Sequence, residues 1–176
     1  MDPDCIRRAQ GGDVRAFAEL IEGRVERMVR TAAAILGSDA DANDVVQDAL
    51  LAAWRQLPSL RDVARFDAWL TSILLNGCRR ALRTRGRRFV REIPAQALAE
   101  ASDGVDLAGA IVRRRALERA FDRLGPTERS ILVLHHLDGR PLDEIAAVLG
   151  VPVGPAKSRL FAARRALQRA LEREDA

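Results

Sequence analysis

Polar and basic residues gather on one face of a helix that the sequence predicts from Pro155 to Arg173. Apolar residues recur there at helical spacing, which predicts one buried face. The opposite face then carries Ser158, Phe161, Ala162 and Arg165, flanked by Lys157, Arg159 and Arg164. In the DNA major groove, basic side chains pair with guanine, serine binds a base or a phosphate, and phenylalanine contacts a thymine methyl group. This face favours DNA binding, although an ordinary pair of antiparallel helices can also present a solvated basic face.

Few other residues could perform chemistry. His135 and His136 are adjacent on a predicted helix, where neighbouring side chains point about 100° apart, so they cannot chelate one metal ion together. Cys5 and Cys78 lack a CxxC spacing, which argues against a zinc site or a disulfide and favours small, partly buried apolar roles. The sequence contains no Walker loop, nucleophile elbow or paired catalytic carboxylate. We therefore expect no enzyme activity, no metal and no cofactor.

A short helix and a tight turn precede the basic helix. The segment LDEIAAVLG predicts an amphipathic helix that ends at Gly150, a residue that allows a left-handed turn. Val151 would then fill the angle between the two helices. A short helix, a glycine turn and a longer basic helix are typical of a helix-turn-helix motif.

The remaining sequence also predicts helices in close succession. The expected elements are an apolar run over 16–36 capped by Asp13 and ended by Gly37, a helix from Ser38 or Asp39 to Leu57 stopped by Pro58, a helix over 66–85, and helical periodicity over 111–124 and 127–137. Strong helix formers dominate, only 4% of residues are aromatic, and no repeat is visible. The fold class expected is all-α.

A change in the sign of the charge divides the chain. Arg79–Arg91 contains seven arginines and no acid, whereas Glu92–Asp106 contains four acids, no base and few large apolar residues. Such a segment is typical of a linker. We predict two small helical domains, residues 1–90 and 108–176, joined by a flexible linker over 91–107, with the helix-turn-helix in the second domain.

The composition indicates an acidic partner and a cytoplasmic setting. The 176 residues carry a net charge of +4 and a pI near 10.2, which favours binding to a polyanion. No apolar run approaches the roughly 20 residues that a membrane span requires, and the polar N-terminus is unlike a signal peptide. We expect a cytoplasmic protein without membrane insertion.

Three segments together resemble the extracytoplasmic-function (ECF) sigma factors of bacterial RNA polymerase. They are DANDVVQDALLAAW, FDAWLTSILLNGCRRALRTR and LGPTERSILVLHHLDGRPLDEIAAVLGVPVGPAKSRLFAARRAL, and the resemblance extends from about Asp13 to Leu171. It implies a protein that directs transcription initiation from the −10 and −35 elements of promoters. The partners implied are core RNA polymerase, through its flap and the clamp coiled coil of its largest subunit, promoter DNA and an anti-sigma protein.

The resemblance implies that the helix beginning near Asp39 docks on the clamp coiled coil. Its docking residues would be Asp44, Gln47, Asp48 and Leu51, which fall opposite the apolar stripe of the helix. Acids in a first helical turn can also serve only to complement the helix dipole. Gln47 and Asp48 lie too far along the helix for that simpler role.

The resemblance assigns −10 recognition to the helix over 66–85 and the loop before it. An unstacked base needs a pocket, and the displaced strand needs a cationic track. The residues expected to supply them are Leu60, Arg61, Phe66, Asn76, Arg79, Arg80 and Arg83.

The −35 element is assigned to the basic helix of the second domain. The residues expected to contact it are His135, Lys157, Ser158, Arg159, Phe161 and Arg165. Two departures from the family pattern prevent transfer of a −35 preference. The usual Gly-Thr-Val is Gly154-Pro155-Ala156 here, and Ala162 replaces an arginine that many members carry.

Two alternatives remain at this point. A helix-turn-helix regulator that acts without docking on polymerase would explain the second domain but not the acidic helix. A small nuclease would need clustered carboxylates or a metal set, which the sequence does not offer.

Overall fold

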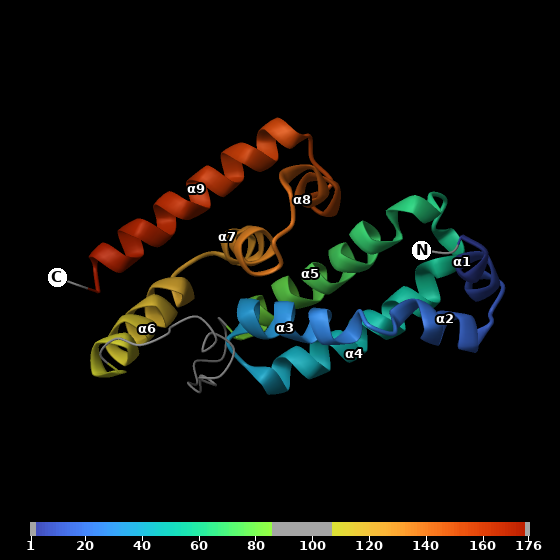
Figure 1. Ribbon diagram of the computed structural model, residues 1–176, viewed down its shortest axis with the longest axis horizontal. Helices are drawn as coiled ribbons and strands as arrows, with labels where there is room; N and C mark the ends of the chain where they lie inside the picture. Colours follow the sequence, from blue (N-terminus) through green and yellow to red (C-terminus); the bar gives the residue numbers. More distant parts are fainter. Residues whose placement is uncertain (1–2, 86–106, 175–176) are drawn as a thin grey trace. The chain divides into compact units, whose positions relative to one another are not determined.

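The computed structural model describes residues 3–85 and 107–174 (Figure 1). Every regular element within these ranges is helical, and they contain no strand. The chain divides into two compact units, Met1–Ile93 and Pro94–Ala176. The predicted all-α class is thereby confirmed. The predicted linker, 91–107, lies outside the described residues except for Leu107, so the limits 1–90 and 108–176 stay predictions.

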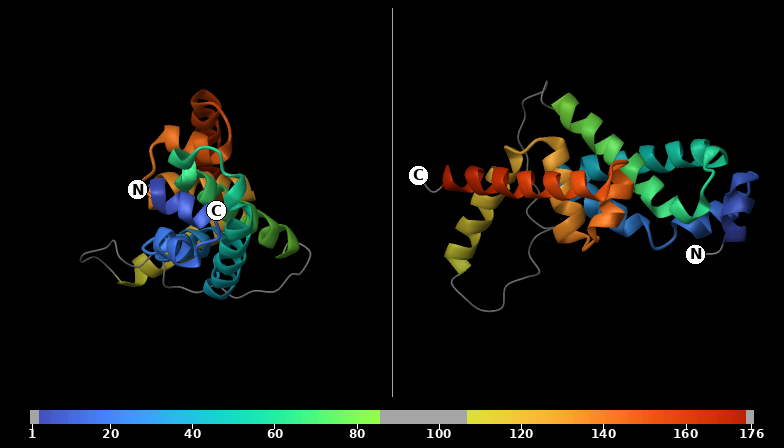
Figure 2. Two further views of the ribbon diagram at one scale, coloured as in Figure 1. Left: turned by 90° about the vertical axis from the view of Figure 1, so that its right-hand side faces the viewer. Right: turned by 90° about the horizontal axis from the view of Figure 1, so that it is seen from above.

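Helices of the first unit pack into one bundle with a corner at its N-terminal end. The elements are α1 (Pro3–Gln10), α2 (Val14–Ile21), α3 (Val25–Leu36), α4 (Asp39–Gln56), the 3₁₀ turns η1 (Leu57–Ser59) and η2 (Val63–Arg65), and α5 (Phe66–Arg85). The helices α3, α4 and α5 all contact one another and lie side by side, while α1 packs against α2 (Figures 1 and 2). The helix predicted over 66–85 is observed as α5, with the same first and last residues.

The apolar run over 16–36 is not one helix, as the sequence analysis expected. It breaks between Ile21 and Val25, where Gly23 has a left-handed φ of 72°. Arg24 stabilises the break, because its guanidinium Nε lies 2.6 Å from the Asp67 carboxylate and Nη1 donates to the carbonyl of Leu20 at 2.5 Å. The turn is therefore held partly by a residue 43 positions away.

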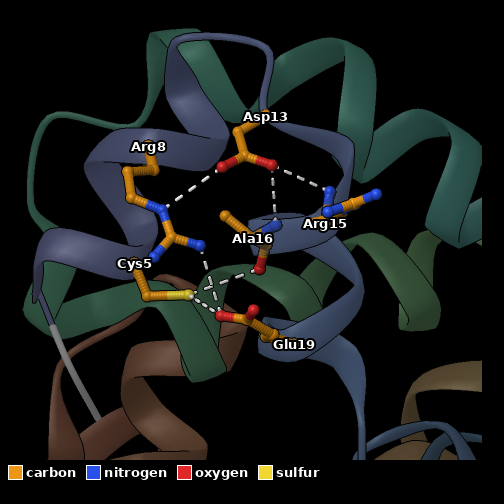
Figure 3. Close-up of polar contacts among 6 residues, drawn as sticks. All are labelled: Cys5, Arg8, Asp13, Arg15, Ala16 and Glu19. Atoms are coloured by element: carbon orange, nitrogen blue, oxygen red, sulfur yellow. Dashed lines mark hydrogen bonds and ion pairs between the residues drawn. The ribbon is translucent and has the colours of Figure 1, made fainter.

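Capping residues define the corner and the start of α4. Asp13 accepts hydrogen bonds from the backbone N–H groups of Arg15 and Ala16 at 2.9 and 3.0 Å, as predicted (Figure 3). Ser38, rather than Asp39, caps α4 by accepting from the N–H of Asp41 at 3.3 Å. These caps satisfy N–H groups that the helix geometry leaves without partners.

Helices of the second unit pack around α9. The elements are α6 (Leu107–Asp122), α7 (Pro126–Leu132), the π-helical turn η3 (Val133–Leu137), α8 (Leu142–Leu149) and α9 (Val153–Glu172). α6, α7 and α8 each contact α9. The last helix begins two residues before the expected Pro155, which nevertheless lies in its first turn, where a missing N–H costs nothing.

A buried arginine fixes the corner between α6 and α7. Arg129 is only 7% exposed, yet its guanidinium donates to the carbonyls of Asp122 at 2.5 Å and Leu124 at 3.2 Å. The charge is balanced by the Asp122 carboxylate at 3.1 Å. These bonds make burial of the cation tolerable and orient α7 ahead of the helix-turn-helix.

Candidate nucleic-acid and polymerase interfaces

The outer face of α4 carries the predicted docking residues. Val45, Val46, Ala49 and Ala53 are buried against the bundle. Exposed on the other side are Asp44, Gln47, Asp48 and Leu51. Leu51 is 48% exposed, which makes it one of few large apolar side chains open to water among the described residues. The face therefore combines acids with an apolar side chain, a composition suited to a basic partner with an apolar contact point.

α5 carries the predicted cationic track on its exposed side. Asn76, Arg80 and Arg83 are exposed, and Arg79 is half-buried. The guanidinium of Arg79 donates to the side-chain oxygen of Asn76, and Arg83 Nε donates to the Arg79 carbonyl at 3.4 Å. Hydrogen bonds thus connect Asn76, Arg79 and Arg83 along one side of the helix, and the exposed guanidinium groups of Arg80 and Arg83 can meet phosphate.

Phe66 does not form part of the exposed loop surface that the sequence analysis expected. Its side chain is fully buried. The Arg24 guanidinium lies over the ring, 5.6 Å from its centroid, and the centroid of a Trp69 ring is 5.7 Å away. The ring therefore anchors the start of α5 and offers no surface to a base. Leu60 is half-buried and Arg61 is exposed, so these two remain on the loop surface.

The helix-turn-helix has the geometry that the sequence predicted. Gly150 adopts a left-handed φ of 64°, and the N–H of Val151 closes the turn on the Ala146 carbonyl at 3.0 Å. Ala156, Leu160 and Ala163 of α9 are buried. The opposite face exposes Lys157, Ser158, Arg159, Phe161 and Arg165.

Phe161 and Arg165 act as one surface group. Phe161 is 62% exposed, and the Arg165 guanidinium lies 5.9 Å from its ring centroid. A cation over an exposed aromatic ring is attracted by about 0.5–1 kcal/mol. The pair places a positively charged guanidinium beside an exposed aromatic ring on the face expected to enter the DNA major groove.

The two histidines of η3 face different partners. His135 Nδ1 lies 3.3 Å from the Arg140 carbonyl, whereas His136 Nε2 accepts from Arg164 Nε at 3.2 Å. Burial, and after it the charge of Arg164, lowers the pKa of His136. The half-buried His135 has little surface for a DNA contact. Across the described ranges, no group of three or more His, Cys, Asp or Glu side chains could hold a metal ion.

The cysteines behave as core residues. Cys78 is fully buried, and burial raises the pKa of its thiol to about 12. Cys5 is 8% exposed and its sulfur lies 3.3 Å from the Ala16 carbonyl. In the part of the chain that the structure describes, no helix is long and apolar enough to cross a membrane.

Two residues with structural influence on these faces were missed from the sequence. Gly77 lies where α5 crosses α4, and a Cβ atom there would be 2.9 Å from Val45 Cγ1. Gln10 contacts the loop before α5 through backbone carbonyls about fifty positions along the chain. Both roles depend on tertiary contacts, for which the local sequence carries no signal.

Family models match both units. Residues 20–88 match sigma-70 region 2, and residues 114–167 match sigma-70 region 4. The chain is 34% identical to the ECF RNA polymerase sigma-E factor of Escherichia coli K12, over 94% of this chain and 92% of that protein. It is 28% identical to the RNA polymerase sigma-H factor of Pseudomonas aeruginosa, over 97% and 94% of the two chains.

Two solved structures share the fold over nearly the whole chain. CnrH in complex with the cytosolic domain of CnrY is 30% identical, with a TM-score of 0.65 and coverage of 96% and 95%. The sigma factor RpoE of Bartonella quintana, in complex with the anti-sigma factor NepR, is 27% identical, with a TM-score of 0.65 and coverage of 90% and 98%. The region 2 match includes the acidic α4, which a regulator without polymerase docking would leave unexplained. The chain belongs to the ECF sigma factors, which direct promoter-specific initiation by bacterial RNA polymerase.

Proposed function

We propose that three surfaces divide the work of this sigma factor. The outer face of α4 binds core RNA polymerase, α5 with the loop 57–65 reads the −10 element, and α9 reads the −35 element. The observation that carries this assignment is the exposure pattern. In each helix the residues assigned to a partner are mostly exposed, while most of the other apolar residues of the same helix are buried or half-buried.

Docking by α4 follows from its charge and its one exposed leucine. Asp44 and Asp48 are one helical turn apart on the same side and suit a basic surface such as the clamp coiled coil. Leu51 adds an apolar contact beside them. The second unit meets the flap of the same enzyme.

Opening of the −10 element uses binding energy alone. The strip of Asn76, Arg79, Arg80 and Arg83 attracts phosphates, and Leu60 with Arg61 borders the site of an unpaired base. Preferential binding of the displaced strand shifts the duplex toward the open state. The chain itself catalyses no reaction.

Recognition of the −35 element uses the exposed face of α9. Lys157 and Arg165 supply donors for guanine or phosphate, and Ser158 and Arg159 flank them. His135 is half-buried beside the Arg140 carbonyl, so it offers DNA only the exposed part of its ring.

An anti-sigma partner and a cytoplasmic site of action complete the proposal. One of the two solved relatives is held by an anti-sigma factor and the other by the cytosolic domain of CnrY. The surfaces that face polymerase and DNA here would be the ones such a partner has to cover. Bacterial core polymerase works in the cytoplasm, and the factor must meet it there.

Run-off transcription with purified core polymerase tests the docking surface. The template is a promoter recovered by selecting transcribed sequences from a random pool. Asp48→Arg should weaken core binding by roughly tenfold or more, which is about 1.4 kcal/mol. Glu26→Arg makes the same charge change at an exposed acid of α3 and should bind normally. Equal binding by the two variants would refute docking through α4.

The DNA surfaces are tested on the same template. Lys157→Ala should reduce discrimination at one −35 position by about 1–3 kcal/mol. Arg169→Ala removes an exposed cation further along α9 and should leave that discrimination intact. Parallel losses in both variants would mean that α9 contributes only general charge.

A further inference from the structure

The helix α1 packs against the loop that precedes α5. It contacts both η1 and η2, the two 3₁₀ turns that make up most of this loop. Gln10, the last residue of α1, makes the polar part of the contact. Its carboxamide nitrogen donates to the carbonyl oxygen of Leu57 at 3.1 Å and to that of Leu60 at 2.7 Å.

These two bonds join segments 47 and 50 positions apart. One NH₂ group has two N–H donors, and both are used on carbonyls three residues apart. The side chain therefore fixes the position of Leu60 relative to the buried Leu57. Leu60 is half-buried and the next residue, Arg61, is exposed, so these two residues form the loop surface at this point.

Gln10 is itself held in place by the corner between α1 and α2. Arg8 lies 3.3 Å from the Asp13 carboxylate and 3.3 Å from the Glu19 carboxylate, while the Cys5 thiol bonds to the Ala16 carbonyl (Figure 3). The N–H of Asp13 also bonds to the Arg8 carbonyl at 3.2 Å and closes the turn after α1. These contacts fix the C-terminal end of α1, from which the Gln10 carboxamide reaches the loop.

We propose that Gln10 is a positioning residue for −10 recognition. It fixes the backbone of residues 57–60. The side chains of Leu60 and Arg61 are thereby positioned to contact an unpaired base of the displaced strand. The inference rests on the proposed role of the loop 57–65. It adds α1, a helix outside the three partner-binding surfaces, to the machinery that selects the base.

Replacement of Gln10 by glutamate separates this role from packing. Gln10→Glu keeps the size and shape of the side chain but replaces both donors with acceptors. Its carboxylate would face two carbonyl oxygens, so the bonds to Leu57 and Leu60 would be lost and the loop released. Gln56→Glu, at an exposed glutamine near the same loop, makes the same charge change and is the matched control.

The measurement is open-complex formation by full-length variants with core polymerase. Templates carry each base at every −10 position, and permanganate reactivity reports opening. Gln10→Glu should reduce the ratio between the preferred and the substituted bases by roughly five- to tenfold, as expected for loss of one or two hydrogen bonds. Core affinity and −35 discrimination should stay unchanged. Amide hydrogen exchange should rise over 57–65 but not in α5.

The variants separate the role of Gln10 from the role of the loop 57–65. Normal −10 discrimination by Gln10→Glu, with loss in Leu60→Ala and Arg61→Ala, overturns the role of Gln10 and leaves the loop as reader. Normal discrimination in all these variants overturns the proposed role of the loop itself. Equal losses in Gln10→Glu and Gln56→Glu mean that charge, not positioning, is the cause. If Gln10→Glu fails to fold, Gln10→Met, which keeps the length without the charge, gives the same test.

Discussion

The contact between α4 and α5 tests how the two helices proposed to bind polymerase and the −10 element are spaced. Gly77 of α5 is buried, and a Cβ atom there would lie 2.9 Å from Val45 Cγ1 and 3.9 Å from the Val45 carbonyl oxygen. Carbon atoms in contact prefer roughly 3.5–4.0 Å. Gly77→Ala therefore requires either the Val45 side chain or the two helices to shift, and neither residue lies near a helix end where the backbone could yield.

The expected energies oppose each other and leave a net loss. An added carbon in a packed core typically costs about 1–3 kcal/mol, whereas alanine gains about 1 kcal/mol over glycine as a helix former. Gly77→Ala should therefore destabilise the first unit by about 1 kcal/mol, a shift of about 4–8 °C in Tm. Val45→Ala alone should cost about 2 kcal/mol through lost burial and a cavity. In the double variant the new methyl group enters that cavity.

Tryptophan fluorescence reports the first unit selectively, because both tryptophans of the sequence, Trp54 and Trp69, belong to it. Thermal unfolding of the four chains gives a double-mutant cycle. The double variant should be more stable than the sum of the single losses by about 1–3 kcal/mol. Strictly additive losses would show that the α4–α5 spacing is not set by this contact.

Three further predictions concern protons and thiols. The hydrogen bond from the Ala16 N–H is the main cause that lowers the pKa of Asp13. The stability that this cap gives is therefore present above the ordinary aspartate pKa and is lost as the pH falls through the lowered pKa of Asp13. Asp13→Ala should flatten the acid side of a plot of Tm against pH. Burial raises the Cys78 pKa to about 12, so iodoacetamide should label it only at the rate of unfolding, as mass spectrometry would detect. The pKa of His136 lies below its ordinary value of about 6.5, so the unfolded chain takes up this proton more readily than the folded one, and the free energy of unfolding should fall as the pH drops below about 6.5. Arg164→Ala should restore the His136 pKa only in part, because burial is the larger cause, and an NMR titration would show a full return if the charge alone were responsible.

Helix faces and most helix ends were predictable because local chemistry sets them. Asp13 and Gly37 mark a start and a stop in the sequence and have those roles in the structure. The exposed and buried faces of α4 and α9 also follow from helical spacing. Periodicity is enough to say which side of a helix can meet a partner.

The main features that sequence reasoning missed depend at least partly on residues far apart in the chain, although α1 (Pro3–Gln10) and the left-handed Gly23 are local features that it also missed. The break after Ile21 is held by Arg24 and Asp67, and the burial of Phe66 depends on the same arginine. Nothing in the local pattern distinguishes a ring that lines a loop from one that anchors it. Long-range contacts decide that question, and a single sequence does not contain them.

The proposed recognition helix shows how such contacts bear on promoter choice. Ala162 is exposed at a position where the family resemblance implies an arginine in many members, so the proposed DNA face of α9 lacks one long donor there. Side chains on a helix lean toward its N-terminus, and Arg165 accordingly lies back over Phe161, beside the vacant position. Its guanidinium can therefore serve the groove next to Ala162, but only from a stacked orientation. A donor fixed against a ring approaches a base edge from a different angle, so the −35 preference of this protein should differ from that of relatives with the arginine in place.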